Sequence, residues 1–166
     1  MKILVVSDSH GVLKNLRQAV EREQPDRIFH LGDLVSDAQR LSCAAPEIPL
    51  EAVVGNCDGW TRGAGSLLLE VEGVSFFLTH GHRYQVKSGL SLLTQAGREA
   101  GADVVCFGHT HQALCRRWPD GTLVVNPGSV GGIHAPATYA VVTVENGCAA
   151  AELKTLEGEN GHAFDH

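Results

Sequence analysis

The chain begins with a short apolar, β-branched run that stops abruptly at a polar cluster. Lys2 to Val6 is followed at once by Ser7-Asp8-Ser9-His10-Gly11. Such a run predicts a buried strand. Because side chains two apart in an extended backbone point the same way, Asp8 and His10 would project together from its carboxyl end. A carboxylate and an imidazole there could hold a metal, although a polar turn that caps the next helix would use the same residues.

Later apolar runs also end in polar clusters. The early runs are separated by segments whose apolar residues have the spacing of a helix. Helices are predicted over Val12–Gln24 and around Asp37–Leu41. This alternation indicates parallel βαβ units, whose ligands bind at the carboxyl ends of the strands. The later runs and the polar residues that follow them are Arg27–Leu31 with Gly32-Asp33, Leu50–Val54 with Gly55-Asn56-Cys57-Asp58, Val74–Leu78 with Thr79-His80-Gly81-His82, and Asp103–Phe107 with Gly108-His109-Thr110-His111.

The second half of the sequence favours antiparallel pairing. Leu67–Val71 and Val74–Leu78 flank Glu72-Gly73 and predict a hairpin. A helix is expected over Ser88–Ala100, weakened by Gly97. The remaining predicted strands are Ala113–Trp118, Leu123–Asn126, Tyr139–Val144 and Cys148–Leu156. We therefore expect an α/β fold with two mixed β-sheets packed face to face and helices on the outside, as one domain over residues 1–157 with a flexible tail over 158–166.

Composition narrows the function classes. The 166 residues are 43% hydrophobic and carry a net charge of −6, which is ordinary for a globular chain and gives no basic footprint for dedicated duplex nucleic-acid binding. No membrane span is expected. Five scattered cysteines without a Cys-x-x-Cys pair predict a reduced, cytoplasmic protein. The oligomeric state stays open.

The polar strand ends are best considered as one set. Each member alone has an ordinary interpretation as a helix cap, a turn residue or a polar strand end, but their recurrence after successive strands favours a single site. The candidate metal ligands are Asp8, His10, Asp33, Asn56, His80, His109 and His111.

These donor types restrict the metal. Two carboxylates, an amide oxygen and four imidazoles are too hard a set for a thiolate-type zinc site and too rich in nitrogen for magnesium or calcium. We expect two divalent ions that share a bridging carboxylate, with manganese first and iron, zinc or nickel as alternatives. Paired ions about 3.5 to 4 Å apart activate water and clamp both oxygens of a phosphoryl displacement. Their surplus positive charge would attract a small phosphoester substrate.

The ordered set Asp8-x-His10, Gly32-Asp33, Gly55-Asn56-x-Asp58, His80 and Gly108-His109-x-His111 resembles the motifs of the calcineurin-like metallophosphoesterase superfamily. Thr79-His80-Gly81-His82 and the lack of a cap domain are similar to its small bacterial and archaeal phosphodiesterase branch. The resemblance implies a metal-dependent phosphoesterase, most simply a phosphodiesterase, with the double-sheet sandwich and Asp33 as the bridge. It also implies one ion on Asp8, His10 and His111, a second on Asn56, His80 and His109, and a hydroxide between them that attacks in line.

The sequence departs from the family pattern at one position. Many members have histidine between the Asn and the acidic residue, where it is thought to protonate the leaving group, and this chain has Cys57. Cys57 could equally be a turn residue. We group Cys57, Asp58 and His82 as candidates that contact the substrate or the metal ligands, and we interpret Asn126-Pro127-Gly128-Ser129 first as a turn.

Two other functions remain open. The retromer's small subunit resembles this fold and serves as a non-catalytic scaffold. A mononuclear metal-binding protein without hydrolysis is the third possibility. Metal analysis followed by a turnover assay separates all three.

Overall fold

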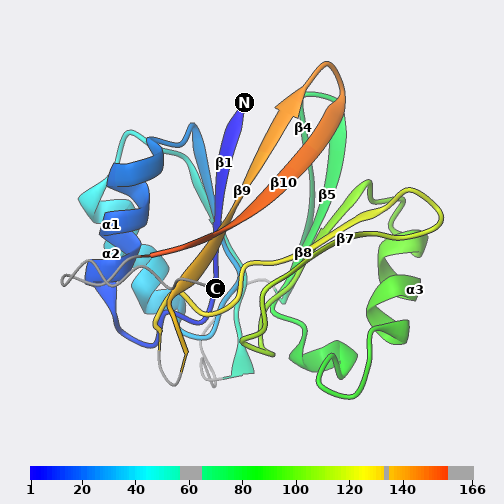
Figure 1. Cartoon of the computed structure of the whole chain (residues 1–166), viewed down its shortest axis with the longest axis horizontal. Helices are drawn as coiled ribbons and strands as arrows, with labels where there is room; N and C mark the ends of the chain where they lie inside the picture. Colours follow the sequence, from blue (N-terminus) through cyan, green and yellow to red (C-terminus); the bar gives the residue numbers. More distant parts are fainter. Residues whose placement is uncertain (57–64, 133–134, 157–166) are drawn as a thin grey trace.

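The computed structural model describes residues 1–56, 65–132 and 135–156, and it contains two five-stranded mixed sheets (Figure 1). Sheet A has the order β10-β9-β1-β2-β3 and sheet B the order β4-β5-β6-β8-β7. Sheet A comprises β1 (Lys2–Val6), β2 (Arg27–His30), β3 (Leu50–Ala52), β9 (Thr138–Glu145) and β10 (Cys148–Thr155). Sheet B comprises β4 (Ser66–Val71), β5 (Val74–Thr79), β6 (Val104–Cys106), β7 (Leu114–Arg117) and β8 (Leu123–Asn126). The predicted pair of mixed sheets is confirmed.

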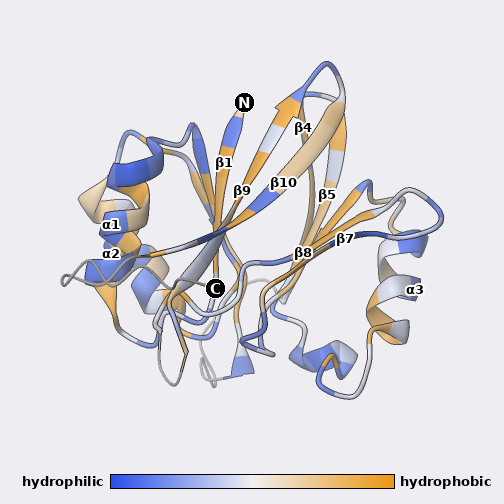
Figure 2. Ribbon diagram, in the orientation of Figure 1, coloured by the Kyte–Doolittle hydropathy of each residue, from blue (hydrophilic) through white to orange (hydrophobic). Residues whose placement is uncertain are grey.

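Alternation along β1 shows how the layers form. Ile3 and Val5 belong to the core between the two sheets, whereas Leu4 and Val6 belong to the core beneath the helices. Those helices are α1 (Leu13–Glu23) and α2 (Val35–Ala44), which cover the outer face of sheet A. Because successive strand side chains point to opposite faces, a strand that is apolar throughout must be covered on both sides. Figure 2 shows the hydrophobic colour running along the central strands.

A third helix, α3 (Ser91–Glu99), covers the outer face of sheet B through Leu93, which packs with Phe77, Val105 and Val124. The 3₁₀ helix η2 (His82–Tyr84) precedes it. α3 begins later than the predicted Ser88 because the Ser88 amide closes a turn onto the Gln85 carbonyl at 2.9 Å and Gly89 has a φ of 144°. Gly97 lies where the helix approaches the sheet, and a Cβ there would be 2.7 Å from Val105 Cγ2. The glycine that weakened the helix prediction is thus what allows the helix to pack closely.

The hairpin predicted at Glu72-Gly73 is confirmed, and β9 and β10 form another. In both turns the two central residues are in the left-handed region. Glu72 and Gly73 have φ of 48° and 85°, and Asn146 and Gly147 have φ of 52° and 74°. This conformation defines the tight turns that match strand twist. Val71 pairs with Val74 across the first turn and Glu145 with Cys148 across the second.

A buried carboxylate fixes the end of α1 to sheet A. Glu23 accepts hydrogen bonds from Tyr139 Oη at 2.5 Å and from Lys154 Nζ at 3.0 Å, and it forms an ion pair with Lys2 Nζ at 3.0 Å. Burial alone would raise the pKa of Glu23, but these partners outweigh it and lower the pKa to about 2. Glu23 therefore joins a helix, both strands of the β9–β10 hairpin and the start of β1.

Strand direction gathers the polar ends at one edge of the molecule. β1, β2 and β3 are parallel in sheet A, and β5 and β6 are parallel in sheet B. Each is followed by one of the polar clusters identified in the sequence. Among the described helices, none has the length and apolar character needed to cross a membrane. The proposed tail, residues 158–166, lies outside the described residues.

Candidate metal centre

Four of the predicted ligands converge. One donor atom from each of Asp8, His10, Asp33 and His111 lies within 4.8 Å of the others. His111 Nε2 is 3.2 Å from Asp8 Oδ1, and His10 Nε2 is 3.5 Å from Asp33 Oδ2. Residues from the two sheets thus meet in a cluster of two carboxylates and two imidazoles, a donor set suited to a transition-metal ion.

Asp8 shows that this cluster fits a cation. Its Oδ2 accepts hydrogen bonds from Ser7 Oγ at 2.6 Å and from the His109 amide at 3.1 Å. Within the described part of the chain, its buried Oδ1 has no hydrogen-bond donor. A buried carboxylate oxygen without a partner is costly, and a bound cation would satisfy it. This oxygen lies 3.2 Å from His111 Nε2 and 3.9 Å from His80 Nε2, both predicted ligands.

His80 and Asn56 form a second part of the site. His80 is fully buried, and its Nδ1 lies 2.8 Å from the Leu31 carbonyl. Because a carbonyl only accepts, Nδ1 must carry the proton, which leaves Nε2 with a free lone pair. Nε2 lies 2.9 Å from Asn56 Oδ1 and 3.9 Å from Asp8 Oδ1. A lone pair facing oxygens, fixed by a carbonyl behind the ring, is the arrangement of a histidine that binds metal.

His109 adds a further imidazole beside His80, with ring centroids 5.0 Å apart. Burial lowers the pKa of His109, and the neighbouring His80 and Lys87 lower it further, while Asp8 acts in the opposite direction. The ring is therefore held in its neutral form, which is the form that binds a metal. His80 and His109 are not within the 4.8 Å group, so the structure brings the seven residues together as one tight cluster and a looser one beside it.

The backbone at this site is unusual. Nine non-glycine residues of the described chain have positive φ, and five of them are candidate ligands. Residues with side chains rarely adopt this conformation, and it persists where the surroundings enforce it. The five ligands are Asp8 (54°), His10 (47°), Asp33 (80°), His109 (71°) and His111 (60°).

The Asn126–Ser129 turn supports these loops from behind. Buried Asn126 donates from Nδ2 to Thr110 Oγ1 at 3.0 Å and to the Gly108 carbonyl at 3.3 Å. Ser129 Oγ donates to the Asp8 carbonyl at 2.8 Å. The sequence identified this segment only as a turn. Its supporting role depends on contacts across many residues, and the one local signal is a polar residue directly after the apolar run of β8.

Of the three other candidates, His82, Cys57 and Asp58, the structure describes only His82. His82 is half-buried, with its ring centroid 5.5 Å from that of His80 and 6.2 Å from that of His109. It lies beside the candidate ligands, and its contact with substrate stays a prediction. Cys57 and Asp58 lie outside the described residues.

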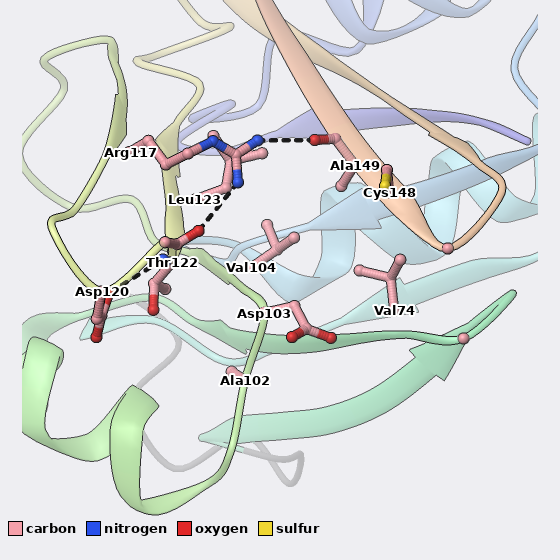
Figure 3. Close-up of a pocket in the computed structure, with 13 residues that line it drawn as sticks. Val74, Ala102, Asp103, Val104, Arg117, Asp120, Thr122, Leu123, Cys148 and Ala149 are labelled. Carbon is pink, nitrogen blue, oxygen red and sulfur yellow. Dashed lines mark hydrogen bonds between the residues drawn. The ribbon is translucent and has the colours of Figure 1, made fainter.

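A separate hollow lies away from the candidate ligands and is lined by none of them. It has a volume of about 620 Å³ and is lined by turns that include Asp103, Arg117 and Asp120 (Figure 3). Arg117 spans it by donating to the carbonyls of Gly121 at 2.9 Å and Ala149 at 3.0 Å. The guanidinium thus joins the β7–β8 turn to β10, which is a structural role. The chemistry of the molecule is concentrated at the opposite ends of the strands.

Comparison with known proteins identifies the family. A model of the calcineurin-like phosphoesterase superfamily domain matches residues 1–147, and the chain belongs to this superfamily. It is 34% identical over 163 residues to the probable metallophosphoesterase YsnB of Bacillus subtilis (strain 168), covering 95% of this chain and 93% of that protein. It is 32% identical over 149 residues to the phosphodiesterase MJ0936 of Methanocaldococcus jannaschii, covering 80% of this chain and 86% of that protein.

Solved structures share the fold. A predicted phosphoesterase from Streptococcus pneumoniae TIGR4 matches with a TM-score of 0.78 at 25% identity, covering 93% of this chain and 88% of that one. A Vps29 single mutant from Entamoeba histolytica matches with a TM-score of 0.75 at 16% identity, covering 95% of this chain and 100% of that one. The second likeness shows the fold alone.

Proposed function

We propose that the chain is a dinuclear metal-dependent phosphoesterase that hydrolyses a small phosphodiester. The observation that carries this proposal is the convergence of Asp8, His10, Asp33 and His111 around a buried carboxylate oxygen without a donor. Membership of a phosphoesterase superfamily supports the reaction class, and likeness to a protein named as a phosphodiesterase supports the diester. We expect manganese first, with iron, zinc or nickel as alternatives.

In this proposal the ligands divide into two sets. Asp8, His10 and His111 hold one ion and Asn56, His80 and His109 the other, with Asp33 shared. Two bound divalent ions supply an activated water and stabilise both the attacking and the leaving oxygen of the displacement. The side chains of His111 and His10 are 39% and 23% exposed, whereas that of Asp8 is buried. These two imidazoles therefore form an open rim where an ester can enter, and the carboxylates of Asp8 and Asp33 form the floor.

Substitution of Asp33 tests the shared ligand. Without this carboxylate, two positive centres would repel each other with nothing between them. We expect Asp33→Ala to lose both ions and turnover, and His10→Ala to keep one ion. The measurement is metal content by mass spectrometry together with hydrolysis of an aryl phosphodiester in Mn²⁺. An Asp33→Ala protein that retains two ions and normal turnover would refute the bridging role.

Two other functions have observations in their favour. The likeness in fold to Vps29 is compatible with the non-catalytic scaffold that the sequence left open. Among the described residues, Asp8, His10, Asp33 and His111 are the one set of acidic, histidine or cysteine donors within 4.8 Å of one another, which favours a mononuclear protein. Two bound ions with turnover support our proposal, and one bound ion without turnover supports the mononuclear protein. A protein with neither bound metal nor turnover supports the scaffold. A panel of mono- and diesters would then define the substrate. The cytoplasmic location stays a prediction.

A further inference from the structure

A second group of buried polar residues lies behind the candidate ligands. Ser9 and His30 are 0% exposed and Asp37 is 1% exposed. Ser9 follows Asp8, His30 ends β2, and Asp37 lies in the first turn of α2. None of them belongs to the proposed ligand set, so the burial of an imidazole and a carboxylate here needs another explanation.

The hydrogen bonds of this group run in one direction. The Gly32 amide donates to His30 Nδ1 at 3.2 Å, so the ring proton lies on Nε2. His30 Nε2 lies 3.1 Å from Ser9 Oγ, which therefore accepts from the ring. The Ser9 hydroxyl proton is then directed to Asp37 Oδ2 at 2.6 Å. Asp37 Oδ2 also accepts from the Gly11 amide at 2.7 Å.

This chain of bonds connects two ligand-bearing loops. At one end, Gly32 directly precedes Asp33. At the other, Ser9 and Gly11 lie on either side of His10. Pairing of β1 with β2 reaches Val6 and His30. Two backbone bonds continue it, from the Leu31 amide to the Val6 carbonyl at 2.9 Å and from the Asp8 amide to the Gly32 carbonyl at 3.2 Å. The side-chain bonds extend the connection to Gly11 and anchor it to α2.

The loops need such an anchor because their backbone conformation is unfavourable. Asp8, His10 and Asp33 all have positive φ. Strained residues at functional sites persist only where the surrounding structure holds them. A short, charge-assisted bond between buried groups is among the stronger means of doing so. Loss of the Ser9 hydroxyl would leave the His30 N–H and the Asp37 carboxylate without this partner and would let the two loops move relative to each other.

We propose that Ser9, His30 and Asp37 are positioning residues that set the separation of the Asp8–His10 loop from Asp33, and thereby the affinity of the Asp8, His10, Asp33 and His111 cluster for a divalent ion. The inference rests on the proposed function, because it requires an ion at this cluster. It assigns a role to residues that touch neither metal nor substrate. Groups that orient ligands from behind typically change metal affinity by about 10- to 100-fold when removed.

The test compares Mn²⁺ affinity with the stability of the metal-free protein. We expect Ser9→Ala to raise the Kd for Mn²⁺ at least about tenfold, measured from the free-Mn²⁺ signal in electron paramagnetic resonance. Asp37→Asn is the second variant, because it preserves the volume and an acceptor oxygen while removing the charge, and we expect its Kd to rise as well. Thermal unfolding in chelator shows that each variant is folded.

Tyr139→Phe is the matched control. It also removes one buried hydroxyl that donates to a carboxylate, Glu23, which forms an ion pair with Lys2 at the start of β1. Its unfolding temperature should fall while its Kd for Mn²⁺ stays unchanged, since the lost hydrogen bond holds the end of α1 and no ligand loop.

The outcomes separate this inference from the proposed function. Weaker Mn²⁺ binding by folded Ser9→Ala or Asp37→Asn, with normal binding by Tyr139→Phe, supports the inference. Lower stability with unchanged affinity in both site variants would mean a purely structural role and would overturn it. A wild-type protein that binds no Mn²⁺ would overturn the proposed function and the inference together.

Discussion

Asp8 divides its two carboxylate oxygens between the protein and the candidate ion. Oδ2 is held by Ser7 and the His109 amide, which fixes the direction of Oδ1. Oδ1 is buried without a donor among the described residues. In the absence of a cation the protein therefore carries an unfavourable group that is useful only when a cation binds. Such a conflict between stability and binding is a property of functional sites.

Asp8→Asn should separate the two effects. The carboxamide can keep an acceptor at the Oδ2 position and place its NH₂ where Oδ1 now lies 3.2 Å from His111 Nε2. We expect the metal-free variant to be more stable than wild type by about 1 kcal/mol, because the buried Oδ1 that has no donor is replaced by a group that donates a hydrogen bond. Mn²⁺ binding by the Asp8, His10, Asp33 and His111 cluster should be lost. The measurements are urea unfolding in chelator at pH 8 and Mn²⁺ titration.

Asp103→Asn is the control for that substitution. Asp103 is exposed, and its Oδ2 accepts from the Ser75 amide at 2.9 Å, so it has no comparable unpaired buried oxygen. This variant should leave both Mn²⁺ binding and stability close to wild type. If metal-free Asp8→Asn were destabilised instead, the unpaired oxygen would not be a source of strain.

At the scale of elements, the sequence predicted the strands and hairpins but not how the helices meet the sheets. Apolar runs and turn residues are local signals, and they located β1, the β4–β5 hairpin and the β9–β10 hairpin. Gly97 suggested a weak helix, but its lack of a Cβ is what allows α3 to pack closely against Val105. The hydrogen bonds that join Ser9 to His30 and Asp37 could likewise not be predicted from the sequence. Spacing along a chain cannot show which polar groups will share a buried partner.

Gly97→Ala should destabilise the protein even though alanine is the better helix former. The added Cβ would lie 2.7 Å from Val105 Cγ2, on a stiff β-branched side chain in the core. We expect a net loss of about 1 to 3 kcal/mol in unfolding free energy despite the gain of about 1 kcal/mol in helix propensity. A double-mutant cycle with Val105→Ala, followed by urea unfolding, isolates the contact. The added methyl should be less destabilising in the Val105→Ala background, and purely additive effects would contradict the close approach.

The Glu23 network should give the protein an acid-sensitive component. The folded-state pKa of Glu23 is about 2, below its ordinary value of 4.5. The carboxylate therefore contributes its full stabilisation above about pH 4.5, and this contribution is lost as the pH falls towards 2. Glu23→Gln should be less stable than wild type at pH 7, and the difference should shrink below pH 4.5. Unfolding free energies of the two proteins from pH 2 to 7 test this, and a constant difference would contradict the assignment.

At the scale of the whole molecule, the candidate centre lies where two sheets meet. Asp8, His10, Asp33 and Asn56 follow strands of sheet A, whereas His80, His109 and His111 follow strands of sheet B. The sequence predicted this gathering because parallel strands end together. It could not predict that four donors would form a tight group and the others a looser one, since that depends on how the sheets are packed. An ion bound here would be a cross-link between the two halves of the sandwich.

Metal binding should therefore stabilise the whole fold and do so in two steps. An ion that binds only the folded protein raises the free energy of unfolding by about 2.7 kcal/mol when its free concentration is 100 times its Kd. The tight group of Asp8, His10, Asp33 and His111 should fill first, because its donors already lie within 4.8 Å of one another, and the looser group second. We expect the unfolding temperature to rise with Mn²⁺ in two phases, the first at lower concentration. Asp8→Asn should abolish the first phase, and Mg²⁺, which prefers oxygen donors, should be a weak substitute. An unfolding temperature that does not change with Mn²⁺ would mean that the two sheets are not joined by metal at this edge.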